Sequence, residues 1–207
     1  MSSLGDFECR VTKSVEASIA VKQSLLRDKT LIASIAEVAE LCLRAYQSGN
    51  KLILFGNGGS AADAQHIAAE FVGRFAFNRP ALPALALSVN TSAITAIGND
   101  YGFDQLFSRQ LEALSRPGDV AMGFSTSGSS PNVLVGISAA KKLGLHTVAL
   151  TGSSGGKLKT APDLDHCICV PSGDTPRIQE CHILIGHIVS ELVEQELFHA
   201  QGRVSGS

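Results

Sequence analysis

The 207-residue chain lacks the features that mark several large classes of protein. Its 17 Lys and Arg against 19 Asp and Glu leave a net charge of −2, so there is no basic field of the kind that attracts nucleic acid. No apolar run reaches about 18 residues, the length that a membrane-spanning helix needs. Residues 1–6 lack the charged and apolar blocks of a signal peptide. We therefore expect a cytoplasmic protein whose partners are neither nucleic acid nor membrane.

The five cysteines are odd in number, and no two of them form a C-x-x-C pair. That count and spacing indicate neither a disulfide framework nor a cysteine zinc site. Cys167 and Cys169 are two residues apart in a predicted strand, so their side chains share one face of it. We expect all five to be buried, reduced thiols, which is the ordinary state of cysteine in a cytosolic protein.

Hydrophobic periodicity divides the chain into a helical start and a longer alternating part. Apolar residues recur at helical spacing from about 8 to 48, with a break near residues 28–30 that predicts two helices. Short apolar runs follow, separated by segments of helical pattern. The predicted strands are 51–55, 84–87, 119–124, 146–150 and 166–170, and the predicted helices are about 60–75, 91–98, 103–115, 130–143, 155–161 and 176–199.

Continuous apolar strands that alternate with helices are typical of a parallel sheet covered on both faces. We therefore predict an α/β fold: a three-layer α-β-α sandwich with a five-stranded parallel doubly wound sheet and an N-terminal helical extension. The length fits a single domain over residues 1–207. Within it, the helices at about 8–48 are expected to serve packing and oligomerisation, and the small polar residues 202–207 to form a frayed tail.

The stretch 55–71 carries the strongest local signal. A buried strand ends there in the glycine-rich turn 56–60, and a helix follows. Such a turn presents unpaired backbone N–H groups, which suit an anion. His66 and Glu70 are four residues apart in the helix and lie on one face. The pattern predicts an anion site beside a pair of metal ligands or acid/base groups. A dinucleotide site is a weaker prediction, because the next strand ends without the carboxylate that would hold a ribose.

Hydroxyl groups crowd the loop 125–131, Ser-Thr-Ser-Gly-Ser-Ser-Pro. Ser130 suits the N-cap and Pro131 the first position of the next helix, so hydroxyls and free amides together predict a phosphate cradle. A flexible serine turn with one capping residue is the alternative. In the loop 96–103, Asn99 and Asp100 suit sugar hydroxyls and tight turns equally well, and the sequence leaves both interpretations open.

The last predicted helix brings a further set of polar side chains into line. Gln179, Ile183 and His187 follow one another at intervals of four and share a stripe. His182 is one turn from Gln179 and is the alternative to His187 as the functional histidine. In doubly wound sheets, sites form at the carboxyl ends of the strands, which is where the loops named above are expected to lie.

In this order, the motifs at 55–71, 99–100, 125–130 and 177–187 resemble the phosphoheptose isomerases of the sugar isomerase (SIS) domain superfamily. The resemblance extends over about residues 10–198. It implies a homotetramer with active sites at subunit interfaces and a phosphosugar substrate. It further implies conversion of sedoheptulose 7-phosphate to D-glycero-D-manno-heptose 7-phosphate, the step that begins ADP- or GDP-heptose biosynthesis for lipopolysaccharide or capsule.

The resemblance also implies the residues of the site. The substrate contacts that it places on this sequence are Asn57, Gly58, Gly59, Ser60, Glu70, Asn99, Asp100, Ser125, Thr126, Ser127, Ser130 and Gln179. The metal ligands that it implies are His66, Glu70, Gln179 and His187, holding one Zn²⁺ per subunit.

Moving a proton from C1 to C2 through an enediol needs a base for carbon and an acid for oxygen. Glu70 is the natural base and His187 the natural acid. A carboxylate on zinc is a poorer base, so either Glu70 leaves the metal during turnover or the zinc mainly organises the site. Some relatives carry an acidic residue where Pro176 stands, and here Asp174 is either its substitute in proton transfer or a turn residue.

Other functions stay open on the sequence alone. A non-catalytic protein of the same fold, such as a bacterial factor that binds the replication initiator, is expected to lack the acid and the histidine that this chain has as Glu70 and His187. An isomerase for a different phosphosugar, or a sugar-phosphate sensor without turnover, would share the binding loops.

Overall fold

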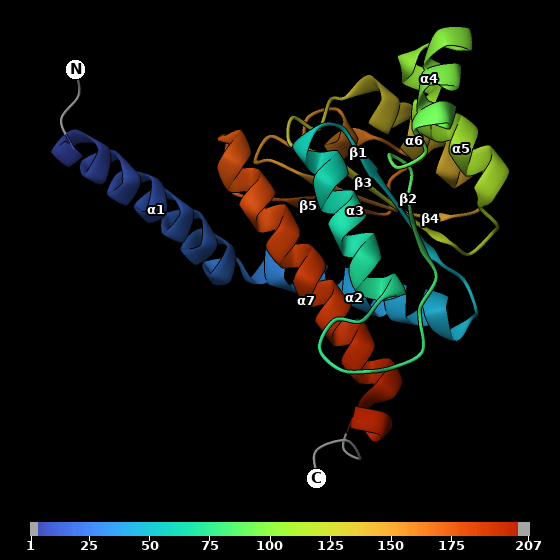
Figure 1. Ribbon diagram of the computed structural model, residues 1–207, viewed down its shortest axis with the longest axis horizontal. Coiled ribbons are helices and arrows are strands. Elements are labelled where there is room, and N and C mark those ends of the chain that lie inside the picture. The colour runs from blue at the N-terminus through green and yellow to red at the C-terminus, as the bar shows by residue number, and fades with distance from the viewer. Residues whose placement is uncertain (1–3, 203–207) are drawn as a thin grey trace.

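The computed structural model describes residues 4–202 and contains one parallel sheet of five strands in the order β2-β1-β3-β4-β5 (Figure 1). Neighbouring strands pair in parallel throughout, with register pairs such as Leu52 with Val120 and Val120 with His146. The strands are β1 (Leu52–Gly56), β2 (Ala84–Ala86), β3 (Val120–Ser125), β4 (His146–Thr151) and β5 (His166–Cys169). The predicted α/β fold is confirmed.

Two apolar cores lie on opposite faces of this sheet, because successive strand side chains point to opposite sides. On β1, Leu52 and Leu54 belong to one core, whereas Ile53 and Phe55 belong to the other. The first core is covered by α2 (Lys29–Gln47), α3 (Gly59–Val72) and α7 (Thr175–Gly202), and the second by α4 (Thr91–Asp100), α5 (Leu106–Leu114) and α6 (Pro131–Lys142). The result is the predicted three-layer sandwich.

The N-terminal helix α1 (Leu4–Arg27) projects from the body of the protein (Figure 1). It ends at Asp28, whose side chain accepts a hydrogen bond from the Leu31 amide at 3.0 Å and caps α2, so the predicted break between two helices is confirmed. Of its residues only Leu25 is buried. Large apolar side chains stay exposed along it: Leu4, Phe7, Val11, Val15, Ile19 and Leu26.

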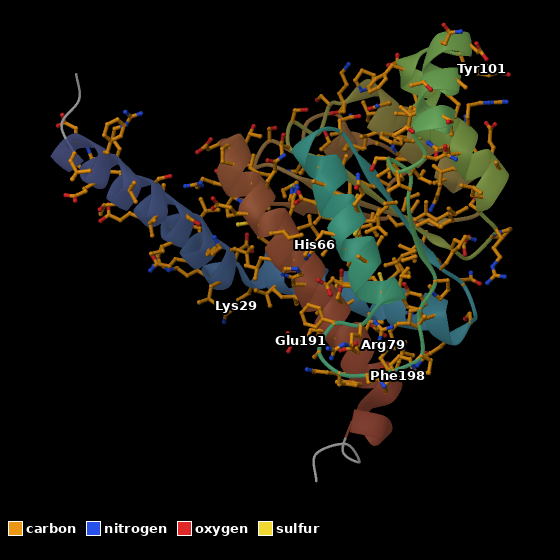
Figure 2. The ribbon with its side chains drawn as sticks, in the orientation of Figure 1. Lys29, His66, Arg79, Tyr101, Glu191 and Phe198 are labelled. Carbon is orange, nitrogen blue, oxygen red and sulfur yellow. The ribbon has the colours of Figure 1, made fainter. Side chains whose placement is uncertain are left out.

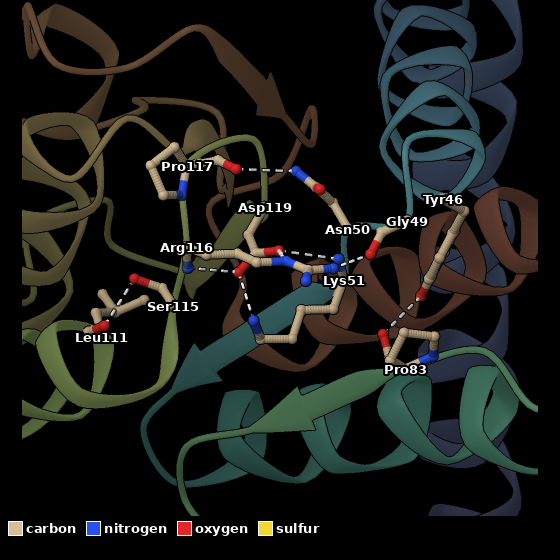
Figure 3. A network of polar contacts seen from close by, with 10 residues as sticks. All are labelled: Tyr46, Gly49, Asn50, Lys51, Pro83, Leu111, Ser115, Arg116, Pro117 and Asp119. Atoms are coloured by element: carbon tan, nitrogen blue, oxygen red, sulfur yellow. Dashed lines mark hydrogen bonds and ion pairs between the residues drawn. The ribbon is translucent and has the colours of Figure 1, made fainter.

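At the amino ends of the strands a buried carboxylate fixes where the sheet begins (Figure 3). Asp119 is fully buried and accepts hydrogen bonds from the Lys51 amide at 3.0 Å, the Lys51 ammonium at 2.6 Å and the Arg116 amide at 2.8 Å. These bonds tie the starts of β1 and β3 together. They lie at the end of the sheet opposite to the carboxyl ends, where the motif-bearing loops emerge.

Two predicted segments differ from the structure. The predicted helix at 155–161 is only a short 3-10 turn, η2 (Leu158–Thr160), because Gly155 and Gly156 have φ values of 67° and 52°, outside the helical region. The predicted loop at 96–103 is largely helical. The helix α4 continues to Asp100, so Asn99 and Asp100 stand in its last turn and not in a loop.

The expectation of five buried thiols is wrong for Cys9, which is exposed on the projecting α1. Cys42 and Cys181 are buried, and Cys167 and Cys169 are half-buried because β5 is an edge strand. The predicted frayed tail begins too early, since Gly202 still belongs to α7, and residues 203–207 lie outside the described part. Within that part, none of the helices has the length and apolar character needed to cross a membrane.

Candidate active site

The turn after β1 brings two distant helices together. Gly58 holds the N-cap position of α3, and Ser60, with only 4% of its surface exposed, packs under the turn. A Cβ on Gly59 would lie 2.4 Å from Nε2 of Gln179, so the amide of this α7 residue covers the first turn of α3. Asn57 exchanges two hydrogen bonds with Asn132 of α6, at 2.8 and 2.9 Å, which links the turn to the helix behind the serine loop.

The helices α3 and α7 run side by side and in the same direction (Figure 1). Their close approach continues further along, where a Cβ on Gly186 would lie 2.4 Å from Cδ1 of Ile67. Because Gly59 and Gly186 have no side chain, the backbone of each helix can contact a side chain of the other at these points. The polar stripe of α3 then faces the polar stripe of α7.

Three side chains converge where these stripes meet. The Nε2 atoms of His66 and His187 are 2.9 Å apart, and Oε1 of Glu70 lies 3.1 Å from the first and 4.0 Å from the second. All three potential ligand atoms lie within 4.8 Å of one another. Two imidazole nitrogens and one carboxylate oxygen form a donor set that suits zinc and related cations. The residues present therefore fit a metal ion.

The cluster is open to solvent on one side, since the side chains of His66, Glu70 and His187 are 52%, 21% and 37% exposed. In Figure 2 the label of His66 stands between α3 and α7. A carboxylate that is only partly exposed and lies beside two imidazoles can take and return a proton next to a bound molecule. The arrangement can thus serve metal binding, acid/base chemistry or both.

A buried ion pair, which the sequence did not reveal, connects the two helices that carry the cluster. Arg79 donates to Oε1 of Glu194 at 2.9 Å and to the backbone oxygen of Glu70 at 2.8 Å, so it bonds one residue on each of the two site helices. Glu194 also accepts the amides of Phe75 and Ala76. Burial would raise the pKa of Glu194, but these amide and guanidinium hydrogen bonds outweigh it and hold the pKa below its ordinary value.

The same anchor places an aromatic ring against the site. The ring of Phe75 lies 5.7 Å from that of His187, centroid to centroid. Arg79 is labelled near the lower parts of α3 and α7 in Figure 2, where the chain crosses between them. The one signal in the sequence was Glu194 itself, a charged residue next to Val193 within the apolar pattern of the last helix.

The serine loop after β3 is a compact cluster of hydroxyls. The Oγ atom of Ser125 lies 2.9 Å from that of Ser130 and 3.5 Å from that of Ser127. Ser130 does occupy the N-cap position of α6, but its side chain makes no capping hydrogen bond there, because it bonds Ser125 instead. The prediction that the Ser130 side chain caps α6 is therefore wrong, while the predicted cluster of hydroxyls is present.

The loop is locked to the loop that follows β4. The carbonyl of Gly128 accepts the Leu158 amide at 2.9 Å, and a Cβ on Gly128 would lie 2.0 Å from the oxygen of Gly155. A cavity of about 310 Å³ lies beside it, among the loops after β3, β4 and β5 and the start of α7. Its lining is mostly polar: Thr126, Ser127, Gly152, Ser153, Ser154, Ser172, Gly173, Thr175 and Ile178.

One predicted pair stands apart from these groups. Asn99 and Asp100 are exposed and bond one another, with Nδ2 of the first 2.7 Å from Oδ1 of the second. They belong to α4, which packs against α5 and η1 (Phe103–Gln105) and lies far from α7 in Figure 1. A single protomer does not bring these two residues to the histidine cluster.

The chain is similar to known proteins of one family. Residues 19–152 match the family model described as the SIS domain. A phosphoheptose isomerase from Aneurinibacillus thermoaerophilus is 53% identical over 188 residues, which cover 91% of this chain and 94% of the relative. The chain belongs to the phosphoheptose isomerase family. The family that its motifs resemble is thereby confirmed.

Solved structures of this family have the same fold. A phosphoheptose isomerase from Neisseria gonorrhoeae superposes with a TM-score of 0.85 at 44% identity, covering 91% of this chain and 99% of the other. One from Francisella tularensis gives a TM-score of 0.86 at 36% identity, covering 94% and 100%. The assignment of particular residues to roles in the phosphoheptose isomerase site still rests on the geometry of this chain.

That geometry separates the two histidines that the sequence offered on α7. His187 joins the cluster, whereas His182 is fully buried on the other side of the helix, 5.9 Å from the Phe124 ring. Its Nε2 lies 3.2 Å from the Thr151 carbonyl oxygen, which can only accept, so that nitrogen carries the proton. Burial lowers the pKa of His182 to about 4. The ring is therefore neutral at pH 7 and structural.

This burial predicts an acid-sensitive stability. The pKa of His182 is about 4 when folded and 6.5 when unfolded, so the unfolded chain binds the extra proton as pH falls between these values. The free energy of unfolding should drop by about 2 kcal/mol at pH 5 from this group alone, and recover above pH 6.5. Urea unfolding at pH 7.5 and pH 5 should show a smaller drop for His182→Gln than for wild type. His146→Gln, which changes an exposed histidine, is the control, and equal drops in all three proteins would contradict the prediction.

Proposed function

We propose that the chain is an aldose–ketose isomerase that converts sedoheptulose 7-phosphate to D-glycero-D-manno-heptose 7-phosphate through an enediol. The observation that carries this proposal is the convergence of Glu70 with His66 and His187 from two facing helices, with the carboxylate oxygen 3.1 and 4.0 Å from the imidazole nitrogens. Membership of the family supports it, because the relatives at about half identity are named phosphoheptose isomerases.

In this proposal Glu70 takes the proton from C1 of the ketose and returns it to C2. His187 donates a proton to the oxygen at C2 and accepts the one from the oxygen at C1, so that the carbonyl moves from C2 to C1 without net gain or loss. An anionic enediolate is costly unless positive charge or donors lie close to its oxygens. His66, whose Nε2 lies 3.1 Å from Oε1 of Glu70, orients the carboxylate.

We assign Zn²⁺, one per subunit, to the cluster. His66, Glu70 and His187 supply three ligands, and the proposed fourth is Gln179, whose amide lies over Gly59 in the first turn of α3. A bound zinc ion supplies a Lewis acid that stabilises charge on the enediol oxygens. Because Glu70 is both ligand and base in this scheme, the order in which it serves the two roles is open to experiment.

The remaining predicted residues form the binding surface for the sugar phosphate. The serine loop is proposed to hold the phosphate through hydroxyls and backbone amides, remote from the reacting carbons, and so to supply positioning energy. The polar cavity of about 310 Å³ that Thr126 and Ser127 line is next to it. The proposed contacts are Asn57, Gly58, Gly59, Ser60, Glu70, Asn99, Asp100, Ser125, Thr126, Ser127, Ser130 and Gln179.

We further propose a homotetramer whose active sites lie at subunit interfaces. The exposed apolar stripe of α1 supports it, because such a stripe is costly in water unless another surface covers it. The position of Asn99 and Asp100 supports it too, since within one protomer they lie far from the cluster and a neighbouring subunit must supply them. Light scattering of the full chain should give four times 21.6 kDa. A monomer at working concentration would refute the assembly. The predicted cytoplasmic location stays a prediction.

The first test removes the proposed base while keeping its shape. Glu70→Gln should lower kcat by about 10²- to 10⁴-fold, the range that positioned acid/base groups contribute. Turnover of sedoheptulose 7-phosphate, read as appearance of the aldose phosphate, measures it. Glu112→Gln, which changes an exposed glutamate on α5, should keep wild-type activity. Wild-type turnover in Glu70→Gln would remove Glu70 as base.

The same assay decides what the metal does. Complete chelation that abolishes turnover, with recovery on adding Zn²⁺, would support a working metal. Turnover that survives chelation would leave the acid/base pair alone at work and assign the ion to organising the site. Wild-type protein that is folded, tetrameric and zinc-loaded but does not turn over this substrate would overturn the proposed substrate and favour a different phosphosugar.

A second prediction concerns the phosphate. Ser127→Ala combined with Ser130→Ala should mainly raise KM, because these hydroxyls bind a part of the substrate that does not react. Steady-state kinetics with the full substrate measures the effect, and Ser115→Ala, whose hydroxyl only bonds the Leu111 carbonyl, is the matched control. An unchanged KM would place the phosphate elsewhere or on backbone amides alone.

A further inference from the structure

Two thiols stand side by side on the edge strand β5, on the face of the sheet away from the histidine cluster. The Sγ atoms of Cys167 and Cys169 are 3.8 Å apart. Ile168 between them points the other way, into the core beneath α7. Neither thiol takes part in the proposed isomerase site, and both are half-buried and thus within reach of solvent.

The surroundings of the pair favour negative charge on sulfur. The Thr151 hydroxyl lies 3.3 Å from the sulfur of Cys169 and can donate to it. The hydrogen bond from the Cys167 thiol is the largest influence on Cys169, and with Thr151 and the Lys159 cation it outweighs burial and lowers the pKa of Cys169 to about 6. The pKa of Cys167 is raised, because its thiol proton is shared with that neighbour. The two sulfurs are in contact, and the lowered pKa of Cys169 favours the thiolate form of that residue.

The spacing of the two sulfurs matches that of two ligands on one ion. Zinc–sulfur bonds of about 2.3 Å at a tetrahedral angle separate the two sulfurs by about 3.8 Å, and the observed separation is 3.8 Å. A disulfide is a poorer match, since two residues along a strand rise about 6.6 Å, close to the upper limit for bridged Cα atoms. We propose that Cys167 and Cys169 form a binding site for a thiophilic divalent cation of the zinc group.

Binding has a simple balance. The cation displaces the thiol protons of the pair to solvent and is held by two thiolates, so that its double charge is neutralised by the pair. The exposed side of β5 leaves the other coordination positions to water. With only two protein ligands the site exchanges its ion readily, unlike a four-ligand structural zinc site. A bound ion would add a link between Cys167 and Cys169 at the free edge of the sheet.

The test uses Cd²⁺ on the fully reduced full-length protein, because cadmium bound to thiolate shows an ultraviolet charge-transfer absorbance that histidine and carboxylate ligands do not give. We expect this absorbance to saturate at one ion per chain in wild type. It should be lost in Cys167→Ser and in Cys169→Ser. It should be kept in Cys9→Ser, which removes the exposed cysteine on α1. An absorbance that persists in the double variant Cys167→Ser with Cys169→Ser, or none in wild type, overturns the site.

A second measurement needs no variant and so does not depend on their folding. Cd²⁺ should protect Cys167 and Cys169 from alkylation by iodoacetamide, as mapped by mass spectrometry, while Cys9 stays reactive. Equal labelling of the pair with and without Cd²⁺ would contradict the proposal. Since the readouts are thiolate-specific, failure here leaves the isomerase proposal untouched, and failure of the isomerase leaves this site testable.

Discussion

The close approach of α3 and α7 is the constraint on which the candidate site depends. Gly59 and Gly186 lie at two points of contact between the helices, and a side chain at either position would meet Gln179 or Ile67 at 2.4 Å. Without that approach His66 on one helix could not lie 2.9 Å from His187 on the other, with Glu70 4.0 Å from the same histidine. The same two glycines therefore determine how closely the helices pack and where the functional side chains lie. Protein interiors are close-packed, so a functional group cannot be shifted without a change in the packing around it.

The fold could be predicted from the sequence because its elements are local and strongly patterned. Continuous apolar runs gave all five strands, and Asp28 gave the break between the first two helices. The failures have local causes as well. Gly155 and Gly156 take left-handed conformations that stop a helix. The helix α4 continues to Asp100, although Asn99 and Asp100 suit a tight turn equally well.

The candidate site was predictable only in part, since spacing reveals what lies on one helix face but not what faces it. The pairing of His66 with Glu70 follows from a spacing of four. The choice of His187 over His182 depends on which side of α7 meets the sheet, and this is a tertiary fact. Arg79 could not be found at all, because its partners Glu70 and Glu194 are 9 and 115 residues away along the chain.

The interlocked loops after β3 and β4 have a consequence for the thermodynamics of binding. Gly128 is held against Gly155 and bonded to Leu158, so the serine loop is already confined before any ligand arrives. A loop that does not have to be ordered on binding loses little conformational entropy at that step, and more of the interaction free energy appears as affinity. A longer loop after β3 or after β4 would loosen the contacts that confine both loops. We therefore expect the lengths of the two loops to change together or not at all.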